Sequence, residues 1–266
     1  FLGLDPNRIY LFSNTLQAIA VAYAVSAILF LFTKLRTQIV IAIVLLLGFW
    51  AAMEFISVDG YGGGDYTPQR NLAEWIDNAV LGRFRDGAKV VDGVVEFKPT
   101  YHYTWILSSL TFVVTGLLGM FAGVIAKSKM AEQRKLWWFA GTGIALVVAG
   151  LIWSIWHPII KMIWTSSMTL FSGGICFLLL WFCYYLIDYK GYRWGLTLFK
   201  VYGTNSIAAY MMPHFIKMNA ISTALLFGLE QYIGEDWYKM VIALANVVLS
   251  YLLLYYMYKR KIFLKV

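Results

Sequence analysis

Residues 157–174 read HPIIKMIWTSSMTLFSGG and lie between two long apolar segments. This junction contains a histidine, a proline, a lysine, a tryptophan and a Thr-Ser-Ser run, whereas residues 136–156 and 168–187 carry no charged side chain. Polar groups are expensive at membrane depth and tend to be functional where they occur. The stretch therefore predicts a polar junction between two membrane spans, and its role depends on the side of the membrane that it faces.

The composition of the whole chain also indicates a membrane protein. Of its 266 residues, 61% are hydrophobic and 14% are charged, and the mean hydropathy is +0.67. A soluble domain carries about 25% charged residues, and a helix needs about 20 apolar residues to cross a bilayer. The sequence predicts an all-α fold, a polytopic transmembrane helix bundle.

Apolar runs place about seven spans in the chain, at residues 14–33, 38–56, 104–126, 136–156, 168–187, 196–215 and 238–258. Residues 57–103 form a long polar loop with one surface helix at 71–82, where Asn71 is the N-cap and Gly82 the stop signal. Residues 220–227 are expected to form an interfacial or re-entrant helix. We expect residues 1–266 to be a single membrane domain and the C-terminal part of a longer protein, because the sequence starts at Phe1 with neither a methionine nor a signal-peptide pattern.

Charge orients these spans. Loops on one side carry thirteen of the 22 basic residues and two of the 14 acidic ones. Cytoplasmic loops are enriched in Lys and Arg, so these loops and the C-terminus are predicted to be cytoplasmic, with loop 57–103 and the junction on the opposite, extracytoplasmic side. This orientation, rather than nucleic-acid binding, accounts for the net charge of +8. Cys176 and Cys183 fit as small packing residues, and no metal-ligand pattern is present.

Polar residues gather near the predicted outer ends of the spans. His102, His157 and His214 all fall there, which indicates either an outward-facing site or the ordinary polarity of an interface. Glu54 lies about one turn below the same surface, where a carboxylate is a functional candidate or the partner of Lys161 or a tyrosine. Asn205 and Asn246 lie near mid-span and are expected to hydrogen-bond across helices. Five glycines are expected to allow close helix packing: Gly116, Gly119, Gly123, Gly141 and Gly143.

Three motifs follow one another in the order typical of a known family. They are HPIIKMIWTSS (157–167), LIDYKGYRWG (186–195) and VYGTNSIAAYMMPH (201–214), with LQAIAVAY (16–23) and IDNAVLG (76–82) upstream. In this order the chain resembles the second half of the heparan-α-glucosaminide N-acetyltransferase family, which has bacterial membrane members. Ile160 stands where the family has an asparagine and Ala18 where it has an arginine, and the family's catalytic histidine belongs to a segment that this chain does not contain.

The resemblance implies that acetyl passes from cytoplasmic acetyl-CoA to an amino sugar, or another small carbohydrate, on the other side of a bacterial inner membrane. It implies catalytic roles for Lys161, Asn205 and His214. It implies substrate binding by Gln17, Glu54, His157, Trp164, Ser166 and Ser167. The phosphates of CoA would bind basic residues on the cytoplasmic side, where the predicted orientation by itself also places basic residues. These are Lys127, Lys129, Arg134, Lys135 and Arg193. The lipid bilayer is the other expected partner, and the sequence leaves open whether the protein forms a homodimer. The alternative is a sugar permease or a non-catalytic relative of the same fold.

Overall fold

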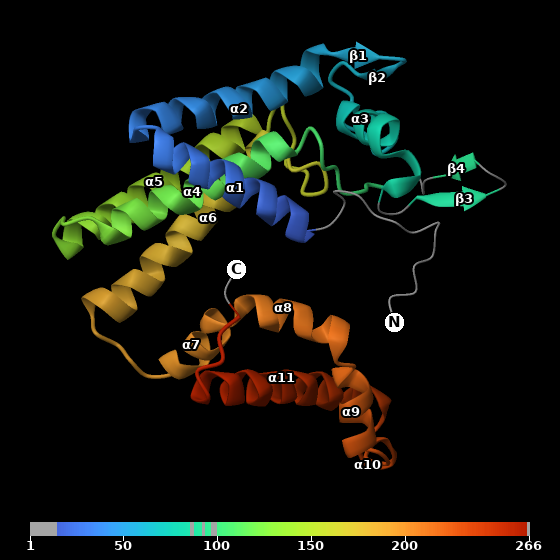
Figure 1. Cartoon of the computed structure of the whole chain (residues 1–266), viewed down its shortest axis with the longest axis vertical. Coiled ribbons are helices and arrows are strands. Elements are labelled where there is room, and N and C mark those ends of the chain that lie inside the picture. The colour runs from blue at the N-terminus through green and yellow to red at the C-terminus, as the bar shows by residue number, and fades with distance from the viewer. Residues whose placement is uncertain (1–14, 86–87, 92–93, 97–99, 265–266) are drawn as a thin grey trace. The chain divides into compact units, whose positions relative to one another are not determined.

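In the described part of the chain, most residues lie in helices, and the strands form two short hairpins (Figure 1). The structure is a computed structural model that describes residues 15–85, 88–91, 94–96 and 100–264. It divides into two compact units, Phe1–Gly191 and Tyr192–Val266, and each is described by itself. That both units form a single membrane domain stays a prediction.

Six helices in the described part of the chain are long and apolar enough to cross a membrane. They are α1 (Thr15–Phe32), α2 (Leu35–Phe55), α4 (Ser109–Lys127), α5 (Glu132–Trp153), α6 (Ser166–Tyr184, prolonged by a π-helical turn over Tyr185–Tyr189) and α11 (Glu235–Lys259). Each overlaps a span predicted from the sequence. The protein is an integral membrane protein built as an all-α bundle, as its composition predicted.

The prediction of one continuous span over 196–215 is wrong. The segment forms two helices, α7 (Leu196–Thr204) and α8 (Ser206–Phe215), because Asn205 leaves the helical region with φ −133° and ψ 41°. Its side chain binds the backbone of the chain's end: Nδ2 donates to the Ile262 carbonyl at 3.0 Å, and Oδ1 accepts from the Leu264 N–H at 3.0 Å. An asparagine that bonds to backbone elsewhere competes with the helix that contains it.

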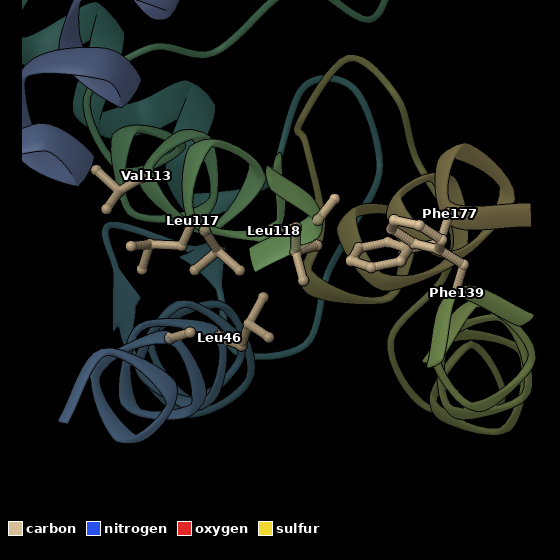
Figure 2. Packing of buried hydrophobic residues seen from close by; sticks show 9 residues of the cluster. Leu46, Val113, Leu117, Leu118, Phe139 and Phe177 are labelled. Atoms are coloured by element: carbon tan, nitrogen blue, oxygen red, sulfur yellow. The ribbon is translucent and has the colours of Figure 1, made fainter. Parts of the chain in front are cut away.

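The core of the first unit lies where α2, α4, α5 and α6 meet (Figure 2). Leu117 and Phe139 are fully buried there, together with Leu46, Val113, Leu118 and Phe177. Helices α5 and α6 approach each other closely because glycines lie between them. A Cβ on Gly174 would lie 2.6 Å from the Val147 nitrogen, and one on Gly143 would lie 2.9 Å from Leu178. Close packing is confirmed at Gly143, and also at Gly116, where a Cβ would lie 2.5 Å from Ser26 Oγ.

The other three predicted packing glycines differ from these. Around Gly119, Gly123 and Gly141, no described atom lies within 4 Å of an added Cβ. The expectation of close packing is therefore wrong at these three positions. Spacing alone did not separate them from Gly116 and Gly143, because the distinction depends on which helix face meets a neighbour.

The α2–α4 loop, residues 56–108, is the largest connection in the first unit. It begins with a hairpin of β1 (Ser57–Val58) and β2 (Tyr61–Gly62) and continues through α3 (Leu72–Leu81), a 3₁₀ turn (Gly82–Phe84) and the hairpin of β3 (Lys89–Val91) and β4 (Val94–Glu96). The helix predicted at 71–82 is confirmed as α3, and its Leu72 and Ala73 pack against Phe49 and Met53 of α2. Its N-cap is Asn71, whose side chain accepts the Glu74 N–H at 2.8 Å, as a capping asparagine should.

The second unit packs α7 and α8 against α11 around Val201, Ala208, Met212 and Leu254. It also contains α9 (Met218–Leu225) and α10 (Glu230–Ile233), and α9 overlaps the helix predicted near 220–227. The expectation that Asn246 bonds across helices is confirmed, because its Oδ1 on α11 accepts from Ser222 of α9 at 2.6 Å.

Candidate functional site

Four residues from distant parts of the first unit form one chain of hydrogen bonds at an end of the bundle. Glu54 comes from the last turn of α2, Tyr66 from the α2–α4 loop, His157 from the α5–α6 junction and Ser166 from the start of α6. The Tyr66 hydroxyl lies 3.1 Å from Glu54 Oε2 and 2.8 Å from His157 Nδ1. The Ser166 backbone N–H donates to His157 Nε2 at 3.0 Å.

These contacts assign the protons. A backbone N–H only donates, so His157 Nε2 is an acceptor and the imidazole is neutral, with its proton on Nδ1. That proton is donated to the Tyr66 oxygen, and Tyr66 donates its own proton to Glu54. Burial of the fully enclosed imidazole lowers the pKa of His157 to about 4, and burial, followed by the bond to Glu54, raises the pKa of Tyr66. The chain of bonds is therefore directional and ends at the half-buried Glu54 carboxylate.

The local sequence holds His157 in place. It follows the end of α5, and its ring packs edge-on or tilted against Phe49, Tyr66 and Trp153, with centroids 5.2–6.0 Å apart. Nε2 accepts a backbone N–H at the first helical residue of α6, which has no partner within its own helix. His157 thus acts as a cap for α6.

A glycine turn lies against the carboxylate end of this network. Gly64 has φ +83°, and a Cβ there would lie 3.3 Å from Glu54 Oε1. A side chain at this position would therefore crowd the carboxylate and strain the backbone. Glycine at this position therefore keeps a side chain away from the Glu54 carboxylate.

The Thr-Ser-Ser run folds the junction back on itself. Thr165, Ser166 and Ser167 are fully buried. Thr165 and Ser167 both donate to the Pro158 carbonyl, at 2.9 and 3.2 Å, and the Ser166 hydroxyl donates to the Leu46 carbonyl at 2.8 Å. These hydroxyls bind protein groups, so their direct effect is to fix the junction.

Trp164 is the strained residue of the junction. Its φ of +56° is rare for a bulky side chain. Its indole donates to Thr115 at 3.2 Å, and its ring meets Phe112 edge-on at 5.1 Å. Strain of this kind persists where the surroundings impose it and often marks a functional segment.

The structure connects Glu54 through Tyr66 to His157 and Ser166. Trp164 and Ser167 belong to the same junction, but their side chains bind Thr115 and the Pro158 carbonyl instead. Lys161 belongs to the same junction, and its side chain is exposed. Gln17 is half-buried in the first turn of α1, where it lines a separate cleft. Tyr66, which joins Glu54 to His157, was not identified from the sequence. It is one of 18 tyrosines, and only the pairing of Glu54 with a tyrosine was anticipated.

Asn205 and His214 belong to the second unit. Asn205 is fully buried and its amide holds the chain's end, so the structure gives it a stabilising contact. The backbone of His214 lies in α8, and its side chain is outside the described part of the chain. A common catalytic set of Lys161, Asn205 and His214 stays a prediction.

Four of the five predicted CoA-binding cations lie at the connection between α4 and α5. Lys127, Lys129 and Arg134 are exposed. Lys135 is buried, and its ammonium contacts Glu132 at 3.1 Å and the Tyr184 hydroxyl at 3.2 Å. Arg193 belongs to the second unit. The structure thus leaves three exposed cations together at this end of the first unit.

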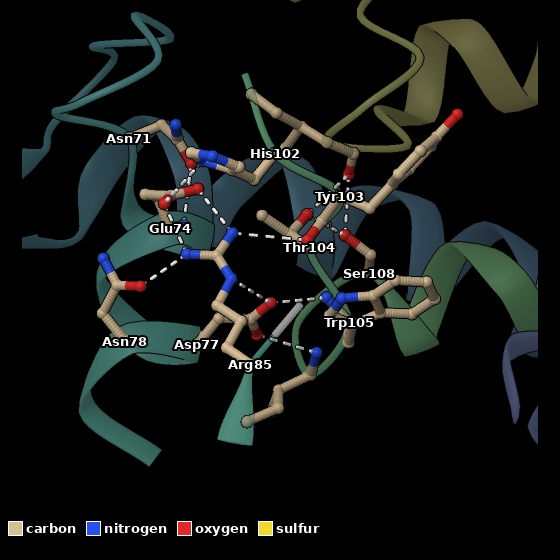
Figure 3. Close-up of polar contacts among 12 residues, drawn as sticks. Asn71, Glu74, Asp77, Asn78, Arg85, His102, Tyr103, Thr104, Trp105 and Ser108 are labelled. Atoms are coloured by element: carbon tan, nitrogen blue, oxygen red, sulfur yellow. Dashed lines mark hydrogen bonds and ion pairs between the residues drawn. The ribbon is translucent and has the colours of Figure 1, made fainter. Parts of the chain in front are cut away.

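A second polar cluster, which sequence reasoning missed, lies inside the α2–α4 loop (Figure 3). The side chain of Arg85 is fully buried and forms a two-point ion pair with Glu74, in which Nη2 lies 2.6 Å from Oε2. Its other partners are Asn78 and the Tyr103 carbonyl, the latter at 3.3 Å. Glu74 and Asn78 are four residues apart on α3, so helical spacing was the available signal.

Asp77 connects the same cluster to the start of α4. Its carboxylate accepts the backbone N–H groups of Trp105 at 2.7 Å and Ile106 at 3.0 Å, and it lies 3.8 Å from Arg85 Nε. Burial raises the pKa of Asp77 to about 6. The cluster therefore fixes the loop helix against the entry to α4.

Within the described residues, no group of three or more His, Cys, Asp and Glu side chains is arranged to hold a metal ion. No protein-family model matches the chain, and no curated protein sequence matches it. The class of protein follows from the fold alone: a helical integral membrane protein with a buried, directional hydrogen-bond chain at one end of its bundle.

Proposed function

We propose that the protein is a transmembrane acyltransferase that transfers acetyl from cytoplasmic acetyl-CoA to the amino group of a sugar on the extracytoplasmic side of a bacterial inner membrane. The observation that carries the proposal is the Glu54–Tyr66–His157 chain of hydrogen bonds. It supports a proton-accepting role for Glu54, and the resemblance described above supports the acetyl donor and the sugar acceptor.

The reaction needs one proton acceptor. The amine nitrogen attacks the thioester carbonyl carbon, the carbon–nitrogen bond forms, and the carbon–sulfur bond breaks to release CoA. The amine must lose a proton in the process, and a positioned carboxylate is a suitable general base. Glu54 would take this proton on the oxygen that does not face Tyr66. Tyr66 and His157 act as positioning residues, because they hold the carboxylate and do not themselves contact the amine.

The positions of the charged groups are consistent with two substrates reaching opposite ends of the bundle. Glu54 lies at the end of α2 that enters the α2–α4 loop, whereas Lys127 and Lys129 lie where α4 leads into α5, at the other end of these helices (Figure 1). Exposed cations there suit the phosphates of CoA.

The direct test supplies labelled acetyl-CoA and glucosamine to the full-length protein in detergent. Glu54→Gln is expected to lower the rate by about 10²–10⁴, the usual contribution of a general base. Glu235→Gln, which changes an exposed carboxylate paired with Lys239 at the start of α11, is the matched control and should keep more activity. Lys161→Ala and Asn205→Ala are expected to lose activity while the protein still folds. A failure to acetylate any amino sugar, together with no binding of CoA, would refute the proposal.

The proposed orientation is tested separately. In a variant that lacks Cys176 and Cys183, a single cysteine replaces either Asp65 or Ser128. A membrane-impermeant thiol reagent should reach Asp65→Cys from outside intact cells and Ser128→Cys only after the membrane is opened. The reverse labelling pattern would overturn the orientation and, with it, the outward-facing acceptor site.

A sugar permease is the second candidate, and one observation in the second unit favours it. An open groove of about 650 Å³ lies there; its walls are mainly apolar, and Asn219, Asn246 and Ser250 are among its polar members. Polar groups that line a cavity at membrane depth are typical of solute paths. A permease would carry sugar into proteoliposomes without acetyl-CoA, and Asn246→Ala would abolish that flux, whereas Glu54→Gln would not.

A further inference from the structure

Three aromatic rings form a stack along the end of α6 and its π-helical turn. The ring centroids of Trp181 and Tyr185 lie 6.1 Å apart with the rings 17° from parallel, and those of Tyr185 and Tyr189 lie 5.8 Å apart at 20°. Eight residues overshoot two turns of an α-helix, but the π turn is wider, and here the Lys190 N–H closes it on the Tyr185 carbonyl at 2.9 Å. The turn therefore keeps Tyr189 on the same face as Trp181. Turns of this kind occur frequently at functional sites.

The stack forms one wall of a groove of about 230 Å³ between α5 and α6, which we call the aromatic groove. The opposite wall comes from the beginning of α5 and consists of Gln133, Leu136, Trp137 and Ala140. These four residues have the i, i+3, i+4, i+7 spacing of one helix face. The side chain of Gln133 is exposed, and its amide can both donate and accept hydrogen bonds. The aromatic groove therefore combines flat ring surfaces with one amide.

Positive charge lies beside the aromatic groove. The Lys190 ammonium is 5.6 Å from the ring centroid of Tyr185 and 5.9 Å from that of Tyr189, and both rings line the groove. Lys127 and Lys129 are exposed on the connection that leads into α5. A ligand that matches these surroundings has a flat part for the rings and a negative charge next to it.

An adenine nucleotide has the chemical groups that match all three features. Nucleobases stack on aromatic side chains, because every base has a π-face. A glutamine amide can bind the edge of adenine at two points, donating to N7 and accepting from the N6 amino group. Phosphates form charge-assisted hydrogen bonds with lysine. A hydrocarbon chain in the same place would use neither the amide nor the cations.

We propose that the aromatic groove binds the adenine ring of the CoA that donates the acetyl group, with Gln133 bonded to the edge of the base and Lys190 next to the phosphates. This inference rests on the proposed function for the identity of the nucleotide. It gives the base of CoA a binding site, whereas the cations described above concern only its phosphates.

Binding of adenosine 3′,5′-bisphosphate tests the groove, because this compound is the adenosine part of CoA with its 3′-phosphate and one 5′-phosphate and carries no acetyl group. The full-length protein is placed in phosphatidylcholine nanodiscs, and titration calorimetry gives the Kd. Trp137→Leu should weaken binding about 5- to 150-fold, the effect of one contact between a base and an aromatic ring. Trp138→Leu is the matched control, because Trp137 and Trp138 are 73% and 56% exposed and Trp138 does not line the groove. It should leave the Kd unchanged.

Guanosine 3′,5′-bisphosphate tests the role of the amide, because guanine has the acceptor O6 where adenine has the N6 donor. The unchanged protein should bind the adenine compound more tightly, and Gln133→Ala should reduce this preference about fivefold or more. Equal binding of the two compounds, or a Kd that Trp137→Leu leaves unchanged, would mean that cations bind the phosphates alone.

Either of these results, or no binding at all, would overturn the adenine site even in a protein that transfers acetyl. The opposite combination separates the two proposals. Nucleotide binding that depends on Trp137 and Gln133, in a protein that acetylates no amino sugar, would support the adenine site and refute the proposed reaction.

Discussion

The Nδ1 atom of His157 lies 2.8 Å from the hydroxyl oxygen of Tyr66, although 91 positions separate the two residues in the chain. This contact joins the α2–α4 loop to the α5–α6 junction. Because Tyr66 also donates to Glu54, the loop, the junction and the end of α2 are held by one tyrosine hydroxyl.

Tyr66→Phe should destabilise the protein by about 1–3 kcal/mol, because it leaves the buried His157 Nδ1–H without an acceptor. The measurement is the free energy of unfolding in detergent. Tyr101→Phe is the matched control: its hydroxyl is exposed and donates to the Tyr66 carbonyl at 2.7 Å, so its loss should matter less. Equal effects of the two substitutions would contradict a buried hydrogen bond between Tyr66 and His157.

His157 should make stability fall as the pH falls from about 6.5 to 4. The folded protein holds His157 neutral with a pKa of about 4, whereas the unfolded chain takes up a proton near its ordinary value of about 6.5. The unfolded state therefore binds more protons in this window, and the loss reaches about 3 kcal/mol below pH 4.

Thermal unfolding at a series of pH values measures this effect. His157→Gln cannot titrate, so the difference between the unchanged protein and the variant should shrink by this amount as the pH falls. Glu54 and Tyr66 face the imidazole and remain in both proteins. A difference that stays constant with pH would show that folding does not lower the pKa of His157, and it would contradict the neutral imidazole of this network.

Arg85→Met should destabilise the protein by about 3–5 kcal/mol, because the change leaves the buried carboxylates of Glu74 and Asp77 without their cation. Unfolding in detergent is the measurement. The control is Arg83→Met, two residues away, where the side chain is exposed and its guanidinium lies over the Phe84 ring at 4.8 Å. Arg83→Met is expected to change stability by about 0.5 kcal/mol or less. Similar losses in both variants would argue against a buried pair.

Gly174→Ala should destabilise the α5–α6 contact by about 1–3 kcal/mol, the usual effect of overpacking. The added Cβ would lie 2.7 Å from the Gly143 carbonyl oxygen. This is a backbone atom, so it cannot move away by a change of side-chain rotamer. Gly141→Ala, on α5 with no described atom within 4 Å of its Cβ, should instead be neutral or stabilise by up to about 1 kcal/mol through helix propensity. Thermal midpoints of the two variants that shift in the same direction would refute the close approach.

Asn205→Ala should release the end of the chain, because both hydrogen bonds to Ile262 and Leu264 are lost. Limited trypsin digestion should then cleave after Lys261 several times faster than in the unchanged protein. Thr204→Ala is the neighbouring control, since its hydroxyl bonds only within α7, to the Lys200 and Val201 carbonyls. Unchanged cleavage in Asn205→Ala would mean that the amide does not hold this segment.

Hydropathy was sufficient to predict six of the spans, because burial in lipid depends on the composition of each segment by itself. The loop helix was predictable from its N-cap Asn71 and its stop at Gly82. The break at Asn205 was not predictable in this way. The partners of its amide lie 57 and 59 positions further along the chain. In the sequence alone, an isolated asparagine in an apolar run is compatible with one continuous helix.

In the candidate site, too, some residues were predictable from the sequence and others became visible only in the fold. Glu54 and His157 stood out because charged or titratable groups are rare in such a chain, and both belong to the network. Tyr66 did not, because an aromatic residue in a polar loop is unremarkable until the fold brings its hydroxyl between a carboxylate and an imidazole. Asp77 and Arg85 were passed over for a related reason, since charged residues in a loop are normally solvated.

The loop cluster around Arg85 has a consequence for biosynthesis. Glu74, Asn78 and Arg85 lie close together in the chain and are available to pair as soon as α3 has been made. Asp77 needs the backbone N–H groups of Trp105 and Ile106, which leave the ribosome later. A nascent chain that ends before residue 105 therefore keeps one carboxylate of this cluster open to water, and the loop completes its folding only when the first residues leading into α4 arrive.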